Sequence, residues 1–213
     1  MKTVFVAGAT GRVGSKVVDK LLENNYRVIA GVRNPELIQT GQQLMAVHLD
    51  LHDSVAKIKQ VLKNADAVIC TVGSGGKDLL QTDLNGTVKL MQATELVGIK
   101  RYVQLSSAYA LNQEMWDKIP ALSELTDFNI AKYYSDRWLM HMSHLNYTIV
   151  QPGSLTETPG TGQIKLNPHD PGTNSIEDVA DVLVSVLELP NTIKKVFMMS
   201  DGDQKISEAL KLI

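Results

Sequence analysis

Short apolar runs alternate with longer amphipathic stretches along most of this chain. The first run, Thr3–Ala7, is rich in β-branched residues and leads directly into glycine, a pattern typical of a buried strand. Six further runs have the same character, and we predict that each forms a strand: Tyr26–Val32, Leu44–Leu49, Asp66–Val72, Arg101–Leu105, Tyr147–Gln151 and Lys195–Met199.

The stretches between these runs carry apolar residues at helical spacing. In Val13–Glu23, for example, Val17, Val18, Leu21 and Leu22 fall on one helical face. We predict further helices that follow the N-cap residues Ser54 and Ser175, and others over Thr82–Val97, Thr126–His144 and Ser207–Leu212.

Repeated strand–helix–strand units indicate the fold class. Their connections are crossovers, and crossovers of this length produce a parallel sheet covered by helices on both faces. We therefore predict a doubly wound α/β fold with the strand order 3-2-1-4-5-6, to which Lys195–Met199 adds a seventh strand. Residues 1–213 are expected to form a single domain. The less periodic residues 108–124 and 152–174 would supply small substrate-side elements, with a short strand at Gln163–Leu166.

Composition excludes several classes of partner. The 21 basic and 23 acidic residues nearly balance, which argues against a nucleic-acid binder, and no apolar run approaches the roughly 20 residues that span a bilayer. A lone cysteine, Cys70, fits a reducing compartment, so a cytoplasmic protein is expected. The pairs His141/His144 and His48/His52 lack further ligands, so we predict no metal site. The oligomeric state stays open.

The segment Gly8–Gly14 is the most informative part of the sequence. It follows a predicted strand and begins a predicted helix, the context in which a glycine-rich loop binds a dinucleotide. Its first glycine permits a sharp turn, its second leaves room for a pyrophosphate at the helix N-terminus, and its third permits close packing of the helix. The alternative is an ordinary strand–helix turn. We predict that the cofactor is held by Gly8, Thr10, Gly11, Arg12, Val13 and Gly14.

The residues after the second strand bear on the choice between NAD and NADP. An acid there would bind the ribose 2′-hydroxyl, whereas an arginine would accept a 2′-phosphate. The sequence has Arg33 at this point and no carboxylate before Glu36. We expect Arg12 to reach the same phosphate, so the two cations favour NADP over NAD. The alternative is that both are solvated surface arginines.

Two more strand ends are expected at the cofactor. Asp50 follows the third strand, where its carboxylate would accept a hydrogen bond from the adenine amino group while Leu51 packs nearby. Asp50 is also a suitable helix N-cap. The fourth strand ends in the segment Thr71–Gly75, whose small residues would let the backbone approach the cofactor ribose, and we predict that Thr71, Val72 and Gly73 bind the cofactor. The alternative is an ordinary loop.

Together these segments resemble the short-chain dehydrogenase/reductase superfamily, and within it the atypical, NmrA-like group of NAD(P)-binding proteins. The resemblance spans nearly the whole chain, and the glycine loop is its most specific part. It implies a serine after the fifth strand, a ribose-binding lysine on a Tyr-x-x-x-Lys helix, and a Pro-Gly pair near the carboxamide. Ser107 is preferred to Ser106, which is nearer the strand, although either hydroxyl also suits an ordinary turn. The lysine that the resemblance implies corresponds to Lys132, and the Pro-Gly pair corresponds to Pro152 and Gly153.

The chain departs from the family pattern at the tyrosine. Phe128 stands four residues before Lys132, and a phenylalanine cannot donate a proton to a carbonyl. Lys132 can still bind a ribose. Tyr133 and Tyr134 lie on other helical directions, whereas Tyr109 could enter from the loop after the serines.

These residues are consistent with two functions. The first is a reductase that transfers hydride from NADPH to a small carbonyl or quinone-like substrate, with Ser107 and Lys132 as catalytic residues. The second is a non-catalytic NADP-sensing regulatory protein, which Phe128 favours. A sugar-nucleotide epimerase would need a larger substrate domain than residues 152–174 can build.

Overall fold

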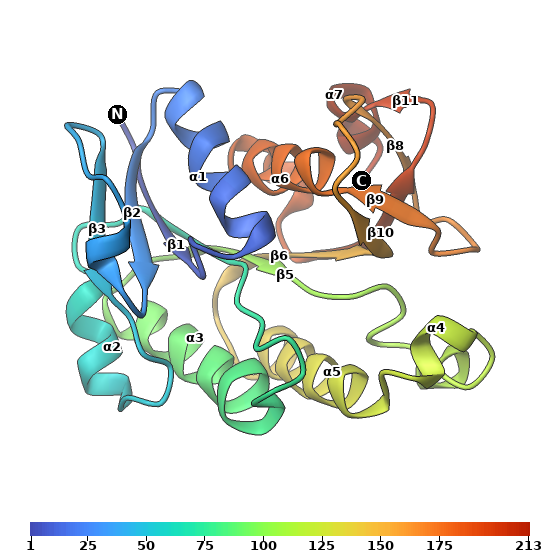
Figure 1. Cartoon of the computed structure of the whole chain (residues 1–213), viewed down its shortest axis with the longest axis horizontal. Helices are drawn as coiled ribbons and strands as arrows, with labels where there is room; N and C mark the ends of the chain where they lie inside the picture. The colour runs from blue at the N-terminus through green and yellow to red at the C-terminus, as the bar shows by residue number, and fades with distance from the viewer.

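A mostly parallel sheet of nine strands divides the molecule into three layers (Figure 1). The computed structural model describes residues 1–213. From edge to edge the sheet runs β11 (Gln204–Lys205), β8 (Gln163–Leu166), β10 (Lys195–Asp201), β6 (Asn146–Pro152), β5 (Arg101–Leu105), β4 (Ala67–Cys70), β1 (Thr3–Ala7), β2 (Arg27–Val32) and β3 (Leu44–His48).

Helices cover both faces of the sheet (Figure 1). α1 (Arg12–Glu23) and α6 (Ile176–Ser185) pack together on one face. The other face carries α2 (Val55–Val61), α3 (Thr87–Leu96) and α5 (Thr126–His141). Shorter elements complete the chain: α4 (Pro120–Ser123), α7 (Ile206–Ala209), and β7 (Ser154–Thr156) paired with β9 (Thr173–Ser175). No helix combines the length and apolar character needed to cross a membrane.

The strand order confirms the predicted doubly wound fold. The sequence 3-2-1-4-5-6 is present, all of its pairs are parallel, and β10 adds the seventh strand beside β6. β8 occupies the residues expected for a short strand, but it joins the main sheet antiparallel to β10. Residues 163–166 therefore extend the core sheet instead of forming a separate substrate-side element.

Successive side chains of the central strand β1 point to opposite faces of the sheet, and both faces are covered by helices. In β1, Val4 and Val6 belong to the apolar cluster beneath α1 and α6, whereas Phe5 and Ala7 belong to the cluster beneath α2 and α3. All four residues are at most 1 % exposed. A strand of this kind reads as a continuous apolar run, which is why its position is evident in the sequence.

The segment expected as one helix over Thr82–Val97 consists of two parts. A π-helical segment, η2 (Leu79–Gly86), precedes α3. Its wider turn brings the carboxylate of Asp83 into the interior, where Oδ2 accepts a 3.0 Å hydrogen bond from the backbone N–H of Ser74. Close packing on Leu51 requires a glycine at 86, because an added Cβ would lie 2.6 Å from the Leu51 Cβ.

The two predicted N-cap serines behave differently. Ser175 Oγ accepts a 3.2 Å hydrogen bond from the backbone N–H of Glu177, as expected for a cap of α6. Ser54 occupies the N-cap position of α2, but its side chain makes no capping hydrogen bond. The helix expected to reach His144 ends at His141.

Candidate functional site

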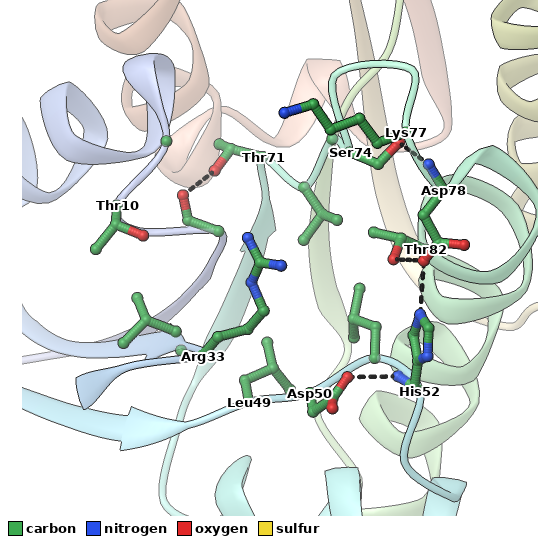
Figure 2. A pocket seen from close by; sticks show the side chains of 17 residues that line it. Thr10, Arg33, Leu49, Asp50, His52, Thr71, Ser74, Lys77, Asp78 and Thr82 are labelled. Carbon is green, nitrogen blue, oxygen red and sulfur yellow. Dashed lines mark hydrogen bonds and ion pairs between the residues drawn. The ribbon is translucent and has the colours of Figure 1, made fainter.

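A cavity of about 740 Å³ opens at the carboxyl ends of β1, β2, β3 and β4 (Figure 2). The predicted cofactor residues that line it are Gly8, Thr10, Gly11, Arg33, Asp50, Leu51, Thr71, Val72 and Gly73. Ser74, from the predicted segment Thr71–Gly75, lines it as well. The structure adds seven lining residues that the sequence analysis did not assign to a cofactor: Gly31, Val32, Leu49, His52, Lys77, Asp78 and Thr82.

The glycine loop presents free backbone donors to this cavity. Gly11 is the N-cap of α1 and has no side chain to cap it, and the first turn holds no acid. The N–H groups of Arg12, Val13 and Gly14 therefore have no partner within the protein. A Cβ added at Gly11 would approach only the carbonyl oxygen of Gly8, at 3.2 Å, so this position faces open space.

Two loop residues lie beneath the cavity instead of lining it. Val13 is buried in the apolar core. At Gly14 an added Cβ would stand 2.0 Å from the Gly8 carbonyl oxygen and 2.7 Å from Thr71 Oγ1, so the glycine is required for packing. Gly8 itself has a φ of +83°, in the left-handed region that favours glycine. Val13 and Gly14 thus contribute backbone and packing, not side chains, to the site.

The structure separates the two arginines that we expected to share a phosphate. Arg33 follows β2, forms no ion pair and extends into the cavity (Figure 2). Arg12 does not line the cavity, because its guanidinium points to the loop after β7 and contacts Glu157 at 3.3 Å. Arg33 is thus the arginine that lines the cavity, whereas Arg12 stays a predicted cofactor residue whose guanidinium contacts Glu157 in this structure.

A chain of hydrogen bonds forms the far wall of the cavity (Figure 2). Asp50 Oδ1 accepts a 2.8 Å bond from the backbone N–H of His52, instead of capping α2. His52 Nε2 lies 2.6 Å from Asp78 Oδ2, which also accepts a 2.5 Å bond from Thr82 Oγ1. The bonds from Thr82 and His52 lower the pKa of the Asp78 carboxyl. This wall ties the end of β3 to η2.

The sequence holds one usable signal for this wall. Ligands of open parallel sheets bind outside the carboxyl ends of the strands, so polar residues after β3 and β4 are natural candidates. His52 stands two residues after Asp50, and Ser74, Lys77 and Asp78 follow β4 closely.

Lys132 lies behind the cavity lining, next to the carboxyl ends of β4 and β5. It is 3 % exposed, and its Nζ is 3.4 Å from the carbonyl oxygens of Val72 and Leu105. Val72 lines the cavity, although Lys132 itself does not. The Phe128 ring is one helical turn away, its centroid 5.6 Å from Nζ. These two long contacts leave donor capacity on a buried ammonium.

The two serines after β5 have different environments. Ser106 is buried, and its Oγ donates a 2.5 Å hydrogen bond to Asp136 Oδ2. Burial raises the pKa of the Asp136 carboxyl to about 6, although the Ser106 bond and the charge of Lys132 oppose the shift. Ser107 is half-buried, and its hydroxyl makes no hydrogen bond within the protein. Only Ser107 has a hydroxyl free for a ligand.

The remaining candidates lie outside the cavity. Pro152 is buried, and a Cβ added at Gly153 would be 2.1 Å from the carbonyl oxygen of Pro171, so this pair packs against another loop. The Tyr109 hydroxyl donates to the carbonyl oxygen of His169. Tyr133 packs edge-on between Trp116 and Tyr134. The structure therefore brings no phenol to the place left by Phe128.

The donor set fits a dinucleotide. The free N–H groups of α1 and the open space above Gly11 suit a pyrophosphate. Arg33 supplies an uncompensated cation after β2, and the buried ammonium of Lys132, which contacts the carbonyl oxygen of the lining residue Val72, has donors to spare. A Cβ added at Gly73 would meet only Asp83 Oδ1, at 3.8 Å, so the backbone there is open to close approach.

Comparison with known proteins agrees with this fit. Residues 8–190 match the family described as NAD(P)H-binding. The chain is 35% identical over 218 residues to the "uncharacterized sugar epimerase YhfK" of Bacillus subtilis, with 98% of each chain covered. The crystal structure of the oxidoreductase ylbE from Lactococcus lactis is 38% identical, has a TM-score of 0.95, and matches over 99% of this chain and 96% of that one.

A more distant solved structure shares the fold alone. It is a short-chain dehydrogenase/reductase from Veillonella parvula in complex with NADP, 18% identical with a TM-score of 0.75 over 95% of this chain and 96% of that one. The family match and the 38% identical oxidoreductase confirm the predicted resemblance to NAD(P)-binding proteins, and the Veillonella structure shows that the fold is shared with a short-chain dehydrogenase/reductase.

Proposed function

This chain belongs to the NAD(P)H-binding family, and we propose that it is an NADPH-dependent reductase of small carbonyl or quinone-like substrates. One observation carries the proposal. Arg33 places an uncompensated cation in the cavity, and the buried, incompletely bonded ammonium of Lys132 lies 3.4 Å from the carbonyl oxygen of Val72, which lines the cavity. The free hydroxyl of Ser107 follows the neighbouring strand β5. The 38% identical ylbE protein is described as an oxidoreductase, which supports this reaction class.

The preference for NADPH rests on Arg33. Its guanidinium has no acid partner, and the nearest cavity carboxylates, Asp50 and Asp78, are already engaged by His52. A planar guanidinium makes paired, charge-assisted bonds to a phosphate but gains little from a neutral hydroxyl. The NADP bound by the Veillonella protein is consistent with this choice.

Bound NADPH supplies the hydride, and the chain's own residues bind and orient the reactants. Donors at the N-terminus of α1 hold the pyrophosphate, and Lys132 Nζ donates to the hydroxyls of the nicotinamide ribose. Ser107 Oγ–H donates a hydrogen bond to the substrate oxygen, which polarises the carbonyl. Because Phe128 has no hydroxyl, the proton that completes the reduction comes from water.

The test is consumption of NADPH by the wild-type protein with small aldehydes, ketones and quinones. We expect turnover that falls at least tenfold in Ser107→Ala while the Kd for NADPH is unchanged. Ser207→Ala, on the exposed surface of α7, is the matched control and should behave as the wild type. Tight NADPH binding without turnover of any substrate class would contradict the reductase.

Phe128 favours a second candidate function, that of a non-catalytic NADP-sensing protein. The ring fills the place where the resembling family has its proton donor, and no other phenol enters the cavity. A sensor would bind NADPH and NADP⁺ with clearly different affinities and would oxidise neither. Titration of both forms, together with the turnover assay, distinguishes the two functions.

A further inference from the structure

We propose that Lys77 is a second phosphate-binding cation of this site, which contacts the pyrophosphate common to NADH and NADPH. Arg33 would then serve the 2′-phosphate alone. The inference rests on dinucleotide binding by the cavity and adds a residue from a different strand end, in the loop between β4 and η2.

The loop that carries Lys77 is fixed at both ends. The backbone N–H of Ser74 donates to the buried carboxylate of Asp83 at 3.0 Å, and Ser74 Oγ accepts a 3.1 Å bond from the N–H of Asp78. Asp78 is anchored in turn by His52 and Thr82. The backbone on each side of Lys77 is therefore held at the rim of the cavity.

The side chain of Lys77 points back over the cavity (Figure 2). It is exposed and makes neither an ion pair nor a hydrogen bond with another residue. The adjacent acid, Asp78, already accepts bonds from His52 and Thr82. The ammonium thus remains an uncompensated charge beside an opening lined by free N–H donors.

Sheet order places the two cations on opposite sides of the glycine loop. β1, which leads into that loop, lies between β4 and β2. Lys77 follows β4 and Arg33 follows β2, so a pyrophosphate at the N-terminus of α1 would lie between them. The first turn of α1 holds no acid that would compete for either cation.

Ligand fragments separate the two roles. ADP carries a pyrophosphate without a 2′-phosphate, whereas adenosine 2′-monophosphate carries a 2′-phosphate without a pyrophosphate. We expect Lys77→Ala to weaken NADPH, NADH and ADP by a common factor of about five to ten, and to leave adenosine 2′-monophosphate unchanged. Lys77→Arg should retain most of the affinity. Lys63→Ala, an exposed lysine outside the cavity, should bind every ligand as the wild type does.

Three outcomes would overturn the inference. Unchanged affinity for all four ligands in Lys77→Ala, with normal wild-type binding, would make Lys77 a surface lysine and leave the proposed function standing. Loss confined to NADPH and adenosine 2′-monophosphate would assign Lys77 to the 2′-phosphate. Failure of the wild type to bind either dinucleotide would overturn this inference and the proposed function together.

Discussion

The β1–β4 end of the sheet and the β5–α5–β6 region use their polar groups in opposite ways. At the first, Arg33, Lys77 and the N-terminus of α1 face an open cavity and have no partner within the protein. At the second, Ser106 and Asp136 are buried and bonded to each other. The first region presents its polar groups to a cavity that suits an anionic ligand. The second encloses its polar groups in the core, where Asp136 Oδ1, Gln104 Oε1 and Asn129 Oδ1 have no hydrogen-bond partner.

This difference separates binding from chemistry. The open cavity gathers donors and cations from several strand ends, so many residues contribute to binding. Proton transfer depends on far fewer atoms, and here the deciding position holds Phe128. Cofactor binding should therefore be sensitive to single changes in the first region, and turnover to a single change in the second.

The largest expected effect comes from Gly11→Val. A β-branched side chain would fill the open space above the α1 N-terminus and should abolish binding of both dinucleotides. The fold should survive, because the only close atom to an added Cβ is the Gly8 carbonyl oxygen at 3.2 Å. Calorimetric titration and thermal unfolding measure the two effects. Gly41→Val is the control, since nothing lies within 4 Å of a Cβ there, and normal binding by Gly11→Val would place the phosphates elsewhere.

Phe128→Tyr should add a proton donor to the second region. The phenol would lie one helical turn from Lys132, whose charge favours the ionised form and lowers the phenol pKa from about 10. General acid catalysis contributes roughly 10²–10⁴-fold, so we expect carbonyl reduction to rise at least tenfold at unchanged NADPH affinity. The double variant Phe128→Tyr, Lys132→Met should lose that gain. An equal gain in both variants would show that the lysine is not involved.

Asp136→Asn tests the buried cluster through the pH dependence of stability. Burial raises the Asp136 pKa to about 6, so between about pH 4 and 6 the folded chain binds the proton more tightly than the unfolded chain. The carboxyl therefore contributes less stability as pH rises, and it costs at most about 3 kcal/mol above pH 6.

The asparagine variant should gain stability over the wild type as pH rises through this range and match it most closely near pH 4. Urea unfolding at about pH 4.5 and 7.5 measures the difference. A difference that does not change with pH would mean that Asp136 does not titrate there.

Arg33→Ala gives the smallest effect and sharpens the contrast between the two arginines. We expect NADPH affinity to fall about tenfold and NADH affinity to stay nearly constant, because only NADPH carries the 2′-phosphate. Arg12→Ala should change neither, since its partner is Glu157 outside the cavity. Equal losses for the two cofactors in Arg33→Ala would remove the basis for NADP preference.

The parts that sequence predicts best are those where one local requirement selects the residues. β1 is apolar at every buried position because both of its faces are covered, and its run is therefore unmistakable. The glycine loop is equally clear, because backbone crowding at Gly14 and the left-handed φ of Gly8 permit no other residue without strain.

The far wall of the cavity escaped prediction because its contacts join distant segments. The pairing of His52 with Asp78 depends on how the loop after β3 meets η2, and no spacing in the sequence encodes it. The π-helical turn that buries Asp83 is a tertiary effect of packing Gly86 on Leu51. The contact between Arg12 and Glu157 was not predicted for the same reason, since Glu157 lies beyond β7 in the chain.

The most direct test of the account follows the hydride itself. NADPH deuterated at the nicotinamide C4 would be incubated with the wild-type protein and a small aldehyde or ketone that it reduces, because the C–D bond formed does not exchange with water. Mass spectrometry of the products would then locate the label. Transfer of deuterium to the reduced substrate, faster with NADPH than with NADH, is the predicted result. Bound NADPH that keeps its deuterium in the presence of every substrate class would contradict the reductase.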